Sequence, residues 1–171
     1  PLVIMSNRTP TVGSGRGKEV GGLVSALTPI VERTGGVWLG WSGAERAPGL
    51  ALAFDPEPPP ALATFDYPPG WREAFYGGFC NQSLWPLLHG FPGRVRYVDE
   101  EWTTYVTANA AYARLAARLT PPPGTVWIHD YHLLLAAAAL LRGGHAGPIG
   151  LFRPVPFPPP DVWEPLPWHR A

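Results

Sequence analysis

The sequence predicts an α/β fold built on a parallel β-sheet with helices on both faces. Short, continuous apolar runs are typical of strands that are buried on both faces. These runs alternate along the chain with helical patterns, as they do in βαβ units. Polar residues gather where the predicted strands end. The predicted strands are residues 2–6, 37–42, 125–130 and 149–152.

The first βαβ unit opens the chain. After the strand at 2–6, a polar, glycine-bearing loop leads into a helix at 23–33, whose apolar residues follow the helical period. Gly35-Gly36 ends this helix, and the strand pattern resumes at 37–42. The apolar stripe of the helix consists of Leu23, Ala26, Leu27, Ile30 and Val31.

Residues 44–70 hold much of the proline. Within them, two short alternating pieces at 50–54 and 61–65 are expected to pair as a hairpin. We interpret the region as a surface excursion and not as a domain boundary.

Two helical stretches follow. The aromatic-rich residues 71–90 are expected to be helical in pieces, broken at Gly77-Gly78 and at Pro86. Residues 100–119 show a stronger helical pattern, with acidic residues at the start and arginines near the end, an order that complements the helix dipole.

A second βαβ unit consists of a strand at 125–130, a helix at 131–142 and a strand at 149–152. Such units form parallel sheets with right-handed crossovers. Ligands of these sheets bind at the carboxyl ends of the strands. The polar or aromatic residues at those ends are Asn7, Arg8, Trp41, Ser42, Asp130 and Arg153.

Composition excludes several classes of protein. The 171 residues are 46% hydrophobic and 15% charged, which allows a packed core of domain size. The formal net charge is zero, so no general field attracts nucleic acid or a membrane surface. The single cysteine, Cys80, fits a reducing compartment. With no long apolar run and no leader pattern, we expect a cytoplasmic protein.

The two ends of the sequence suggest a piece of a longer protein. Pro1 leads directly into a strand pattern, and Ala171 follows what looks like the start of a helix. We therefore expect residues 1–171 to form one truncated domain.

Arg8 and the Gly21-Gly22 doublet are candidate anion-binding residues. A guanidinium that directly follows a strand can hold a phosphate in a fork. Glycines at the start of a helix let an anion approach the free N–H groups of the first turn. The alternatives are a surface arginine that caps a carbonyl and a plain tight turn.

The aromatic residues Trp41, Tyr76 and Trp85 are candidates for sugar binding. Aromatic ring faces stack on the apolar faces of sugars, and a tyrosine hydroxyl reaches sugar oxygens. Trp41 and Trp85 stand in loop-like contexts, which favours a binding role. For Trp38, Trp71 and Trp102 a core position is expected.

The cluster His129, Asp130 and His132 admits two interpretations. One is a metal site, but the spacing lacks further cysteine or carboxylate partners nearby. The other is that Asp130, at a strand end, orients substrate hydroxyls while His129 braces it. We favour the second interpretation and expect no metal.

Taken in order, the motifs of this chain resemble those of the trehalose-6-phosphate synthase family of retaining glycosyltransferases. The resemblance runs nearly from end to end and rests on the ordered combination. The motifs are SNR, GGLVSALTPI, GGVWLGWSG, FYGGFCNQSLWPLLHGF, VWIHDYHLLL and PFPPP.

The resemblance implies a GT-B enzyme with two Rossmann-like domains, of which this chain would be the amino-terminal, acceptor-side one. The nucleotide-binding second domain would be absent. The implied reaction transfers glucose from a nucleotide-glucose, usually UDP-glucose, to glucose 6-phosphate, forming trehalose 6-phosphate without cofactor or metal. The implied partners are therefore small molecules, and a homo-oligomer of the complete enzyme is allowed.

The resemblance also implies roles for individual residues. Arg8 would contact the acceptor phosphate, and Gly22, with Gly21 beside it, would offer its backbone to the donor diphosphate. The acceptor sugar would be lined by Tyr76 and Trp85, with Trp41 nearby. Asp130 would bind acceptor hydroxyls and is the implied catalytic residue.

One position departs from the family pattern. Pro154 stands where the family usually has a histidine beside the donor sugar, and Arg153 precedes it. Proline offers no hydrogen-bond donor to a sugar hydroxyl. This departure keeps two alternatives open: a sugar-phosphate-binding relative without turnover, and a related transferase with another donor or acceptor.

Overall fold

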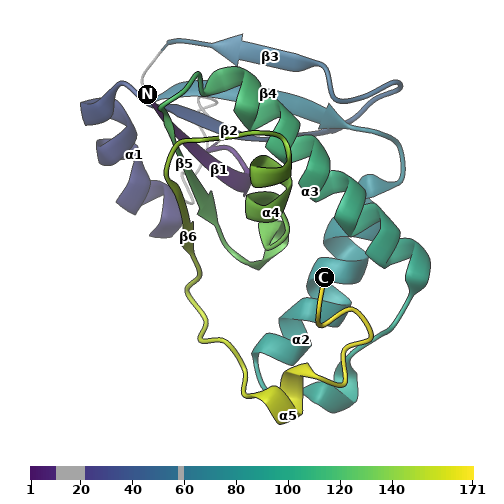
Figure 1. Ribbon diagram of the computed structural model, residues 1–171. Helices are drawn as coiled ribbons and strands as arrows, with labels where there is room; N and C mark the ends of the chain where they lie inside the picture. The colour runs from purple at the N-terminus through teal and green to yellow at the C-terminus, as the bar shows by residue number, and fades with distance from the viewer. Residues whose placement is uncertain (11–21, 58–59) are drawn as a thin grey trace.

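The computed structural model describes residues 1–10, 22–57 and 60–171. Within these residues, six strands form one sheet in the order β3-β4-β2-β1-β5-β6 (Figure 1). Neighbouring strands are parallel except for the antiparallel edge pair β3–β4. The predicted α/β class is therefore confirmed. The strands are β1 (Leu2–Arg8), β2 (Val37–Glu45), β3 (Leu52–Asp55), β4 (Ala61–Tyr67), β5 (Thr125–His129) and β6 (Ile149–Phe152).

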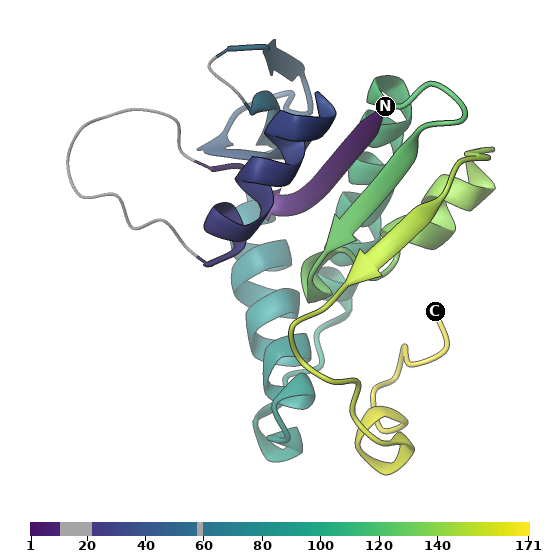
Figure 2. The same ribbon diagram turned by 90° about the vertical axis from the view of Figure 1, so that its left-hand side faces the viewer.

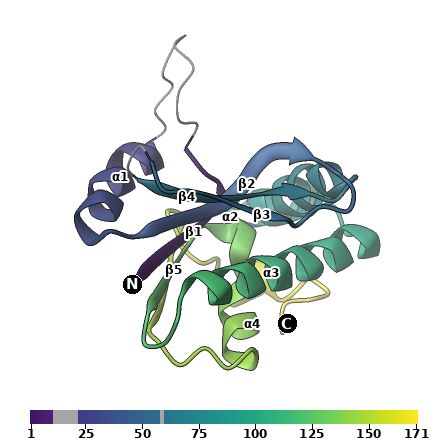
Figure 3. The same ribbon diagram turned by 90° about the horizontal axis from the view of Figure 1, so that it is seen from above.

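Helices cover both faces of the sheet. Helix α1 (Gly22–Thr34) lies on one face, and helices α3 (Asp99–Leu119) and α4 (Ala136–Arg142) lie on the other (Figures 2 and 3). None of the helices in the described ranges is long and apolar enough to cross a membrane. The remaining helical segments are the π-helix η1 (Arg72–Leu84), α2 (Trp85–Leu88), the 3₁₀ turns η2 (Pro92–Arg94) and η3 (Tyr131–Leu133), and α5 (Pro160–Trp163).

The first predicted βαβ unit forms as expected. Helix α1 buries Leu27 and Val31 against Ile4 of β1 and Trp38 of β2. The helix ends at the predicted glycines, because Gly35 adopts a φ of 60°, which favours glycine. Strand β1 is buried on both faces, as its apolar run predicts.

The predicted hairpin forms between β3 and β4, but the description of this region as a surface excursion is wrong. Strand β4 also pairs in parallel with β2 and so belongs to the main sheet. Its side chains Ala63, Phe65 and Tyr67 are fully or almost fully buried. The alternation of residues 61–65 therefore marks a core strand, and only β3 is an edge.

The predicted helix break at Gly77-Gly78 is also wrong, because η1 continues through both glycines. Gly78 is buried against α3, and a methyl group there would lie 2.5 Å from the Cδ atom of Glu101. The glycine thus allows a close helix contact and does not end a helix. The helical run is not interrupted at Pro86 either, because η1 passes directly into α2, and Pro86 lies in the first turn of α2, where proline is tolerated.

The second βαβ unit is confirmed with one refinement. The predicted helix at 131–142 is divided into the turn η3 and the helix α4. The irregular start follows from Asp130, whose positive φ of 74° redirects the chain where β5 ends. Helix α3 agrees closely with its prediction, with Asp99, Glu100 and Glu101 in its first turn.

Candidate functional site

The carboxyl ends of the strands bring the predicted polar residues to one edge of the sheet. Arg8 at the end of β1 is in register with Trp41 of β2. At the next strands, the backbone N–H of Asp130 donates to the carbonyl of Phe152 at 2.8 Å. Arg8, Asp130 and Arg153 therefore lie at the carboxyl ends of adjacent strands, as predicted, whereas Trp41 lies within β2 beside Arg8.

Asp130 has a backbone conformation that is rare for a residue with a side chain. Its φ is 74° and its ψ is 172°, and its carboxylate Oδ1 accepts a hydrogen bond from the N–H of Tyr131 at 2.7 Å. Strained backbone of this kind clusters at functional sites. The conformation is thus an independent observation that supports a functional role at this position.

Opposing effects act on the Asp130 carboxyl group, and burial is the largest of them. Burial raises the pKa of the Asp130 carboxyl group, while the hydrogen bond from Tyr131 and the positive charges of Arg153 and His89 oppose that rise. A partly desolvated carboxylate among such groups is suited to accept hydrogen bonds from ligand hydroxyls.

The two histidines of the cluster are buried neutral rings. Burial lowers the pKa of both His129 and His132 to about 4. His129 packs between Trp127 and Phe152, a position that fits its predicted bracing role. Within the described residues, no group of three or more His, Cys, Asp or Glu side chains is arranged to hold a metal ion.

Tyr76 reaches the site through His132, a contact that the sequence did not reveal. The rings of Tyr76 and His132 stack with centroids 5.7 Å apart, and His132 stacks in turn on Tyr131 at 4.2 Å. This column attaches the middle of η1 to the loop after Asp130. Tyr76 is therefore held beside the strand ends.

Trp85 presents an open ring at the start of α2. It is 40% exposed and stacks on His89 with ring centroids 4.2 Å apart. His89 is close enough to Asp130 to oppose the rise of its pKa, so Trp85 and Asp130 belong to the same region. An exposed aromatic face near a carboxylate is the arrangement expected for sugar binding.

The position of Trp41 differs from the loop position that the sequence predicts. It lies within β2, is buried, and stacks on Tyr67 with centroids 4.5 Å apart and planes 5° apart. The guanidinium carbon of Arg8 lies 5.2 Å from the centroid of the Trp41 ring. The loop interpretation is wrong because β2 continues through the glycines on either side, and Trp41 supports Arg8.

Gly22 is the first residue of α1, as predicted, whereas Gly21 lies outside the described residues. The amino end of α1 is at the same end of the molecule as the carboxyl ends of β5 and β6 (Figure 2). Beside α1 is a hollow of about 500 Å³. It is lined by Ala26, Leu27, Ile30, Trp127, His129, Asp130, Phe152 and Pro154.

Pro154 thus lines the same hollow as Asp130, so the departure from the family pattern falls inside the candidate site. Its neighbour Arg153 lies over the ring of Phe157, with the guanidinium carbon 4.6 Å from the centroid. Within the described residues, the buried Nη1 atom of Arg153 has no hydrogen-bond partner. Arg153 is thus a cation near Asp130 to which the sequence assigns no definite role.

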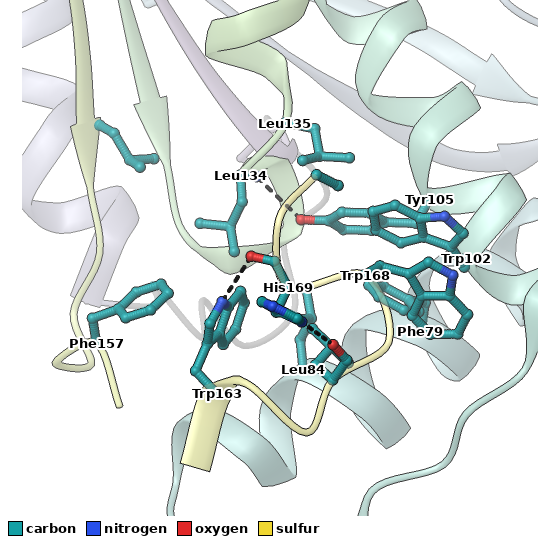
Figure 4. Close-up of a pocket in the computed structure, with 13 residues that line it drawn as sticks. Phe79, Leu84, Trp102, Tyr105, Leu134, Leu135, Phe157, Trp163, Trp168 and His169 are labelled. Atoms are coloured by element: carbon teal, nitrogen blue, oxygen red, sulfur yellow. Dashed lines mark hydrogen bonds between the residues drawn. The ribbon is translucent and has the colours of Figure 1, made fainter. Parts of the chain in front are cut away.

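A smaller hollow of about 280 Å³ lies under the carboxyl-terminal segment (Figure 4). It is largely aromatic, and the rings of Trp102 and Trp168 stack there with centroids 5.2 Å apart. The hydroxyl of Tyr105 already donates to the carbonyl of Tyr131 and accepts from the N–H of Leu134. None of the predicted site residues lines this hollow.

Comparison with known proteins finds relatives along nearly the whole chain. The model of glycosyltransferase family 20 matches residues 5–171. A bifunctional trehalose-6-phosphate synthase/phosphatase of Thermoproteus tenax is 36% identical, over 99% of this chain and 25% of its own length. A trehalose-6-phosphate synthase of Sinorhizobium fredii is 35% identical, over 99% of this chain and 37% of its own length. The chain thus spans only about a quarter to somewhat over a third of these relatives.

Solved structures show the same fold. An alpha,alpha-trehalose-phosphate synthase (UDP-forming) from Burkholderia vietnamiensis superposes with a TM-score of 0.90 at 35% identity, over 98% of this chain and 37% of that one. A synthase from Burkholderia xenovorans in complex with glucose-6-phosphate gives 0.85 at 31% identity, over 99% and 36%. The E. coli protein bound with UDP-2-fluoro glucose gives 0.86 at 31% identity, over 98% and 36%.

Proposed function

The chain belongs to glycosyltransferase family 20, and on that premise we propose that it supplies the acceptor side of a trehalose-6-phosphate synthase. The proposed reaction transfers glucose from a nucleotide-glucose, UDP-glucose by preference, to glucose 6-phosphate. The product is trehalose 6-phosphate with the anomeric configuration of the donor retained. The relatives solved with glucose-6-phosphate and with UDP-2-fluoro glucose support this choice of substrates.

One observation carries the proposal: a cation and a carboxylate lie at the carboxyl ends of adjacent strands, at the ligand-binding edge of the sheet. Arg8 is the last residue of β1, and Asp130 follows β5, the strand that pairs with β1. In the proposed site, Arg8 binds the acceptor phosphate and Asp130 accepts hydrogen bonds from the sugar hydroxyls. Both ends of a sugar phosphate are then fixed by charged hydrogen bonds.

The aromatic residues complete the proposed acceptor pocket. Trp85 offers an exposed ring for the sugar, and Tyr76 stands beside the Asp130 loop, where its hydroxyl can reach a sugar oxygen. In this proposal Trp41 acts mainly by supporting Arg8. Gly22, with Gly21 before it, offers backbone N–H groups to the donor diphosphate.

The proposed chemistry needs positioning more than covalent catalysis. Retention without a carboxylate nucleophile suggests attack on the same face of the donor sugar that the diphosphate leaves. The departing diphosphate then takes the proton of the attacking acceptor hydroxyl. Asp130 contributes by fixing the acceptor so that its reactive hydroxyl faces the donor.

We further propose that a second, nucleotide-binding domain completes the site, since this chain spans 37% or less of the relatives described above. Residues 1–171 are then one wall of a cleft, and as an isolated fragment they do not transfer glucose.

Pro154 favours a second candidate function. It lines the hollow beside Asp130, where the family pattern has a histidine that contacts the donor sugar. A changed residue at this point supports a related transferase that uses another donor. A sugar-phosphate-binding relative without turnover is the other alternative.

Two assays on the full-length protein separate these functions. The first measures UDP release from UDP-glucose in the presence of glucose 6-phosphate, and the second measures binding of glucose 6-phosphate by calorimetry. Release that depends on glucose 6-phosphate supports the synthase. Binding without release from any nucleotide-glucose indicates a non-catalytic relative, and release from a different nucleotide sugar indicates the related transferase.

A further inference from the structure

The side chain of Arg8 lies in a cradle formed by the end of β2. Its guanidinium carbon is 5.2 Å from the centroid of the Trp41 ring. A methyl group on Gly43 would lie 2.7 Å from Arg8 Nη2, so the guanidinium rests directly against this glycine. Within the described residues, the Arg8 side chain makes no hydrogen bond and no ion pair in the protein. No described residue therefore occupies its donors.

The backbone of Arg8 is fixed as closely as its side chain. A methyl group on Gly40 would lie 2.8 Å from the carbonyl carbon of Arg8. The parallel strands β1 and β2 therefore approach each other here more closely than any residue other than glycine permits. The Arg8 carbonyl accepts a hydrogen bond from the Ser6 hydroxyl at 2.7 Å. Ser6 in turn accepts one from the indole N–H of Trp38, also at 2.7 Å.

Two buried tyrosines contact the residues that surround Arg8. The hydroxyl of Tyr67 donates to Asn7 Oδ1 at 3.0 Å, and the hydroxyl of Tyr112 donates to the backbone carbonyl of Asn7 at 2.6 Å. The two hydroxyl oxygens are 2.9 Å apart. Tyr67 also stacks on Trp41, the residue on which Arg8 lies. Asn7 directly precedes Arg8, so the arginine is supported by both phenols through Asn7 and by the ring of Tyr67 through Trp41.

The elements that meet here are distant in sequence. Tyr67 ends β4, Tyr112 comes from α3, and Asn7 belongs to β1. Both tyrosines are fully buried, and burial keeps their phenols neutral by raising the pKa of each well above its usual value. Stability alone does not require this buried polar cluster, because an apolar core has no buried hydroxyl groups that need hydrogen-bond partners. The cluster instead lies next to one exposed arginine.

We infer that Tyr67 and Tyr112 are positioning residues for Arg8, which they hold ready for the phosphate of the acceptor through Asn7 and Trp41. The inference rests on the proposed function and assigns a role to residues that do not contact the substrate. A preset guanidinium loses less conformational freedom when phosphate binds, so affinity rises without any new contact. The cradle therefore acts on acceptor affinity and leaves donor affinity unchanged.

The test uses Tyr67→Phe and Tyr112→Phe in the full-length protein, because each change removes only a hydroxyl. Each variant should raise the KM for glucose 6-phosphate by about three- to tenfold, with the KM for UDP-glucose and kcat nearly unchanged. In an Arg8→Ala background, the same changes should have no further effect on the KM for glucose 6-phosphate.

Ser83→Ala is the matched control for simple loss of stability. Ser83 is also fully buried, and its hydroxyl donates to the carbonyl of Arg96 and not to the Arg8 cluster. This control should lower the melting temperature as the tyrosine variants do, without raising the KM for glucose 6-phosphate. Gly43→Ala provides a second route if the tyrosine variants do not fold. It places a methyl group against Arg8 from an exposed position. Because Gly43 has a φ of 100°, which disfavours a side chain, its folding is checked by circular dichroism, and the folded variant should raise the same KM.

The inference is overturned if both tyrosine variants keep the wild-type KM for glucose 6-phosphate. It is also overturned if they raise the KM values of both substrates, or if their effect persists without Arg8. If the wild-type protein makes no trehalose 6-phosphate, the proposed function fails separately. The same variants are then compared by the calorimetric Kd for glucose 6-phosphate, where a weakening that disappears without Arg8 still supports positioning, and unchanged values contradict it.

Discussion

The carboxylate of Glu101 on α3 packs directly against Gly78 on η1, with no space for a methyl group between them. A salt bridge restrains the rotamer of Glu101, because its Oε1 lies 3.0 Å from Nη2 of Arg96. The contact sets the separation of η1 from α3. Since η1 carries Tyr76 to the loop after Asp130, this separation also affects the candidate site.

We predict that Gly78→Ala destabilises the protein by about 1–3 kcal/mol, as overpacking of a filled contact does. The adjacent Gly77→Ala is a matched control, because a methyl group there would meet only the carbonyl of Arg72 at 3.5 Å, an ordinary contact. Urea denaturation of both variants measures the difference. Equal free energies of unfolding would show that Glu101 moves aside without cost.

We predict that stability falls as the pH is lowered from about 6.5 to about 4. Burial lowers the pKa of His129 and His132 to about 4 in the folded protein, whereas an exposed histidine titrates near ~6.5. Between these values the unfolded chain binds more protons, so unfolding becomes easier as the pH falls. The contribution is complete above about pH 6.5 and amounts to at most about 3 kcal/mol for each histidine.

Denaturation by urea across this pH range measures the effect. His132→Phe keeps a ring for stacking between Tyr76 and Tyr131 and removes one of the two titrating groups. Its stability should therefore depend less steeply on pH than that of the wild type. Identical slopes for the two proteins would mean that His132 titrates normally.

We predict that Arg8→Ala, in the full-length protein, raises the KM for glucose 6-phosphate by about tenfold or more. A hydrogen bond to a charged group contributes roughly 1.5–3 kcal/mol, which sets this scale. Arg46→Ala serves as the control, because the Arg46 side chain is 77% exposed and pairs with Asp66. An unchanged KM for Arg8→Ala would leave Arg8 as a surface residue.

We predict that Pro154→His increases turnover with UDP-glucose. The histidine restores a hydrogen-bond donor in the hollow beside Asp130, and one neutral hydrogen bond is worth about 0.5–1.5 kcal/mol, a several-fold change in rate. Initial rates are compared for variants whose folding is checked by circular dichroism. A folded variant that is equally fast or slower would support a transferase adapted to another donor.

The sequence predicted the fold well because local patterns determine it. The continuous apolar run at 2–6 identifies a parallel strand that is buried on both faces. The run at 149–152 also marks a parallel strand, but β6 lies at the edge of the sheet, where Leu151 and Phe152 are exposed. The errors at Gly78 and in residues 61–65 have one cause, since both depend on contacts between distant segments. Nothing near Gly78 indicates that Glu101 will pack on it, and nothing in 61–65 indicates that β4 will pair with β2.

The sequence predicted the location of the candidate site better than it predicted the contacts between its side chains. Strand order alone brings Arg8 and Asp130 to one edge. The stacking of Tyr76 on His132 and the burial of Trp41 on Tyr67 depend on side-chain packing between elements that are far apart in sequence. Local sequence patterns do not indicate such pairs. The contacts of Tyr67 and Tyr112 with the residues around Arg8 are therefore evident only from the structure.

The central claim is that this chain supplies the acceptor site of a trehalose-6-phosphate synthase. Product analysis by NMR, after incubation of the full-length protein with UDP-glucose and glucose 6-phosphate, tests it most directly. We predict trehalose 6-phosphate with retained configuration, a rate lower by about 100-fold or more for Asp130→Ala, and no product from residues 1–171 alone. A folded full-length protein that binds glucose 6-phosphate but forms no product, or an Asp130→Ala variant as fast as the wild type, would contradict the claim.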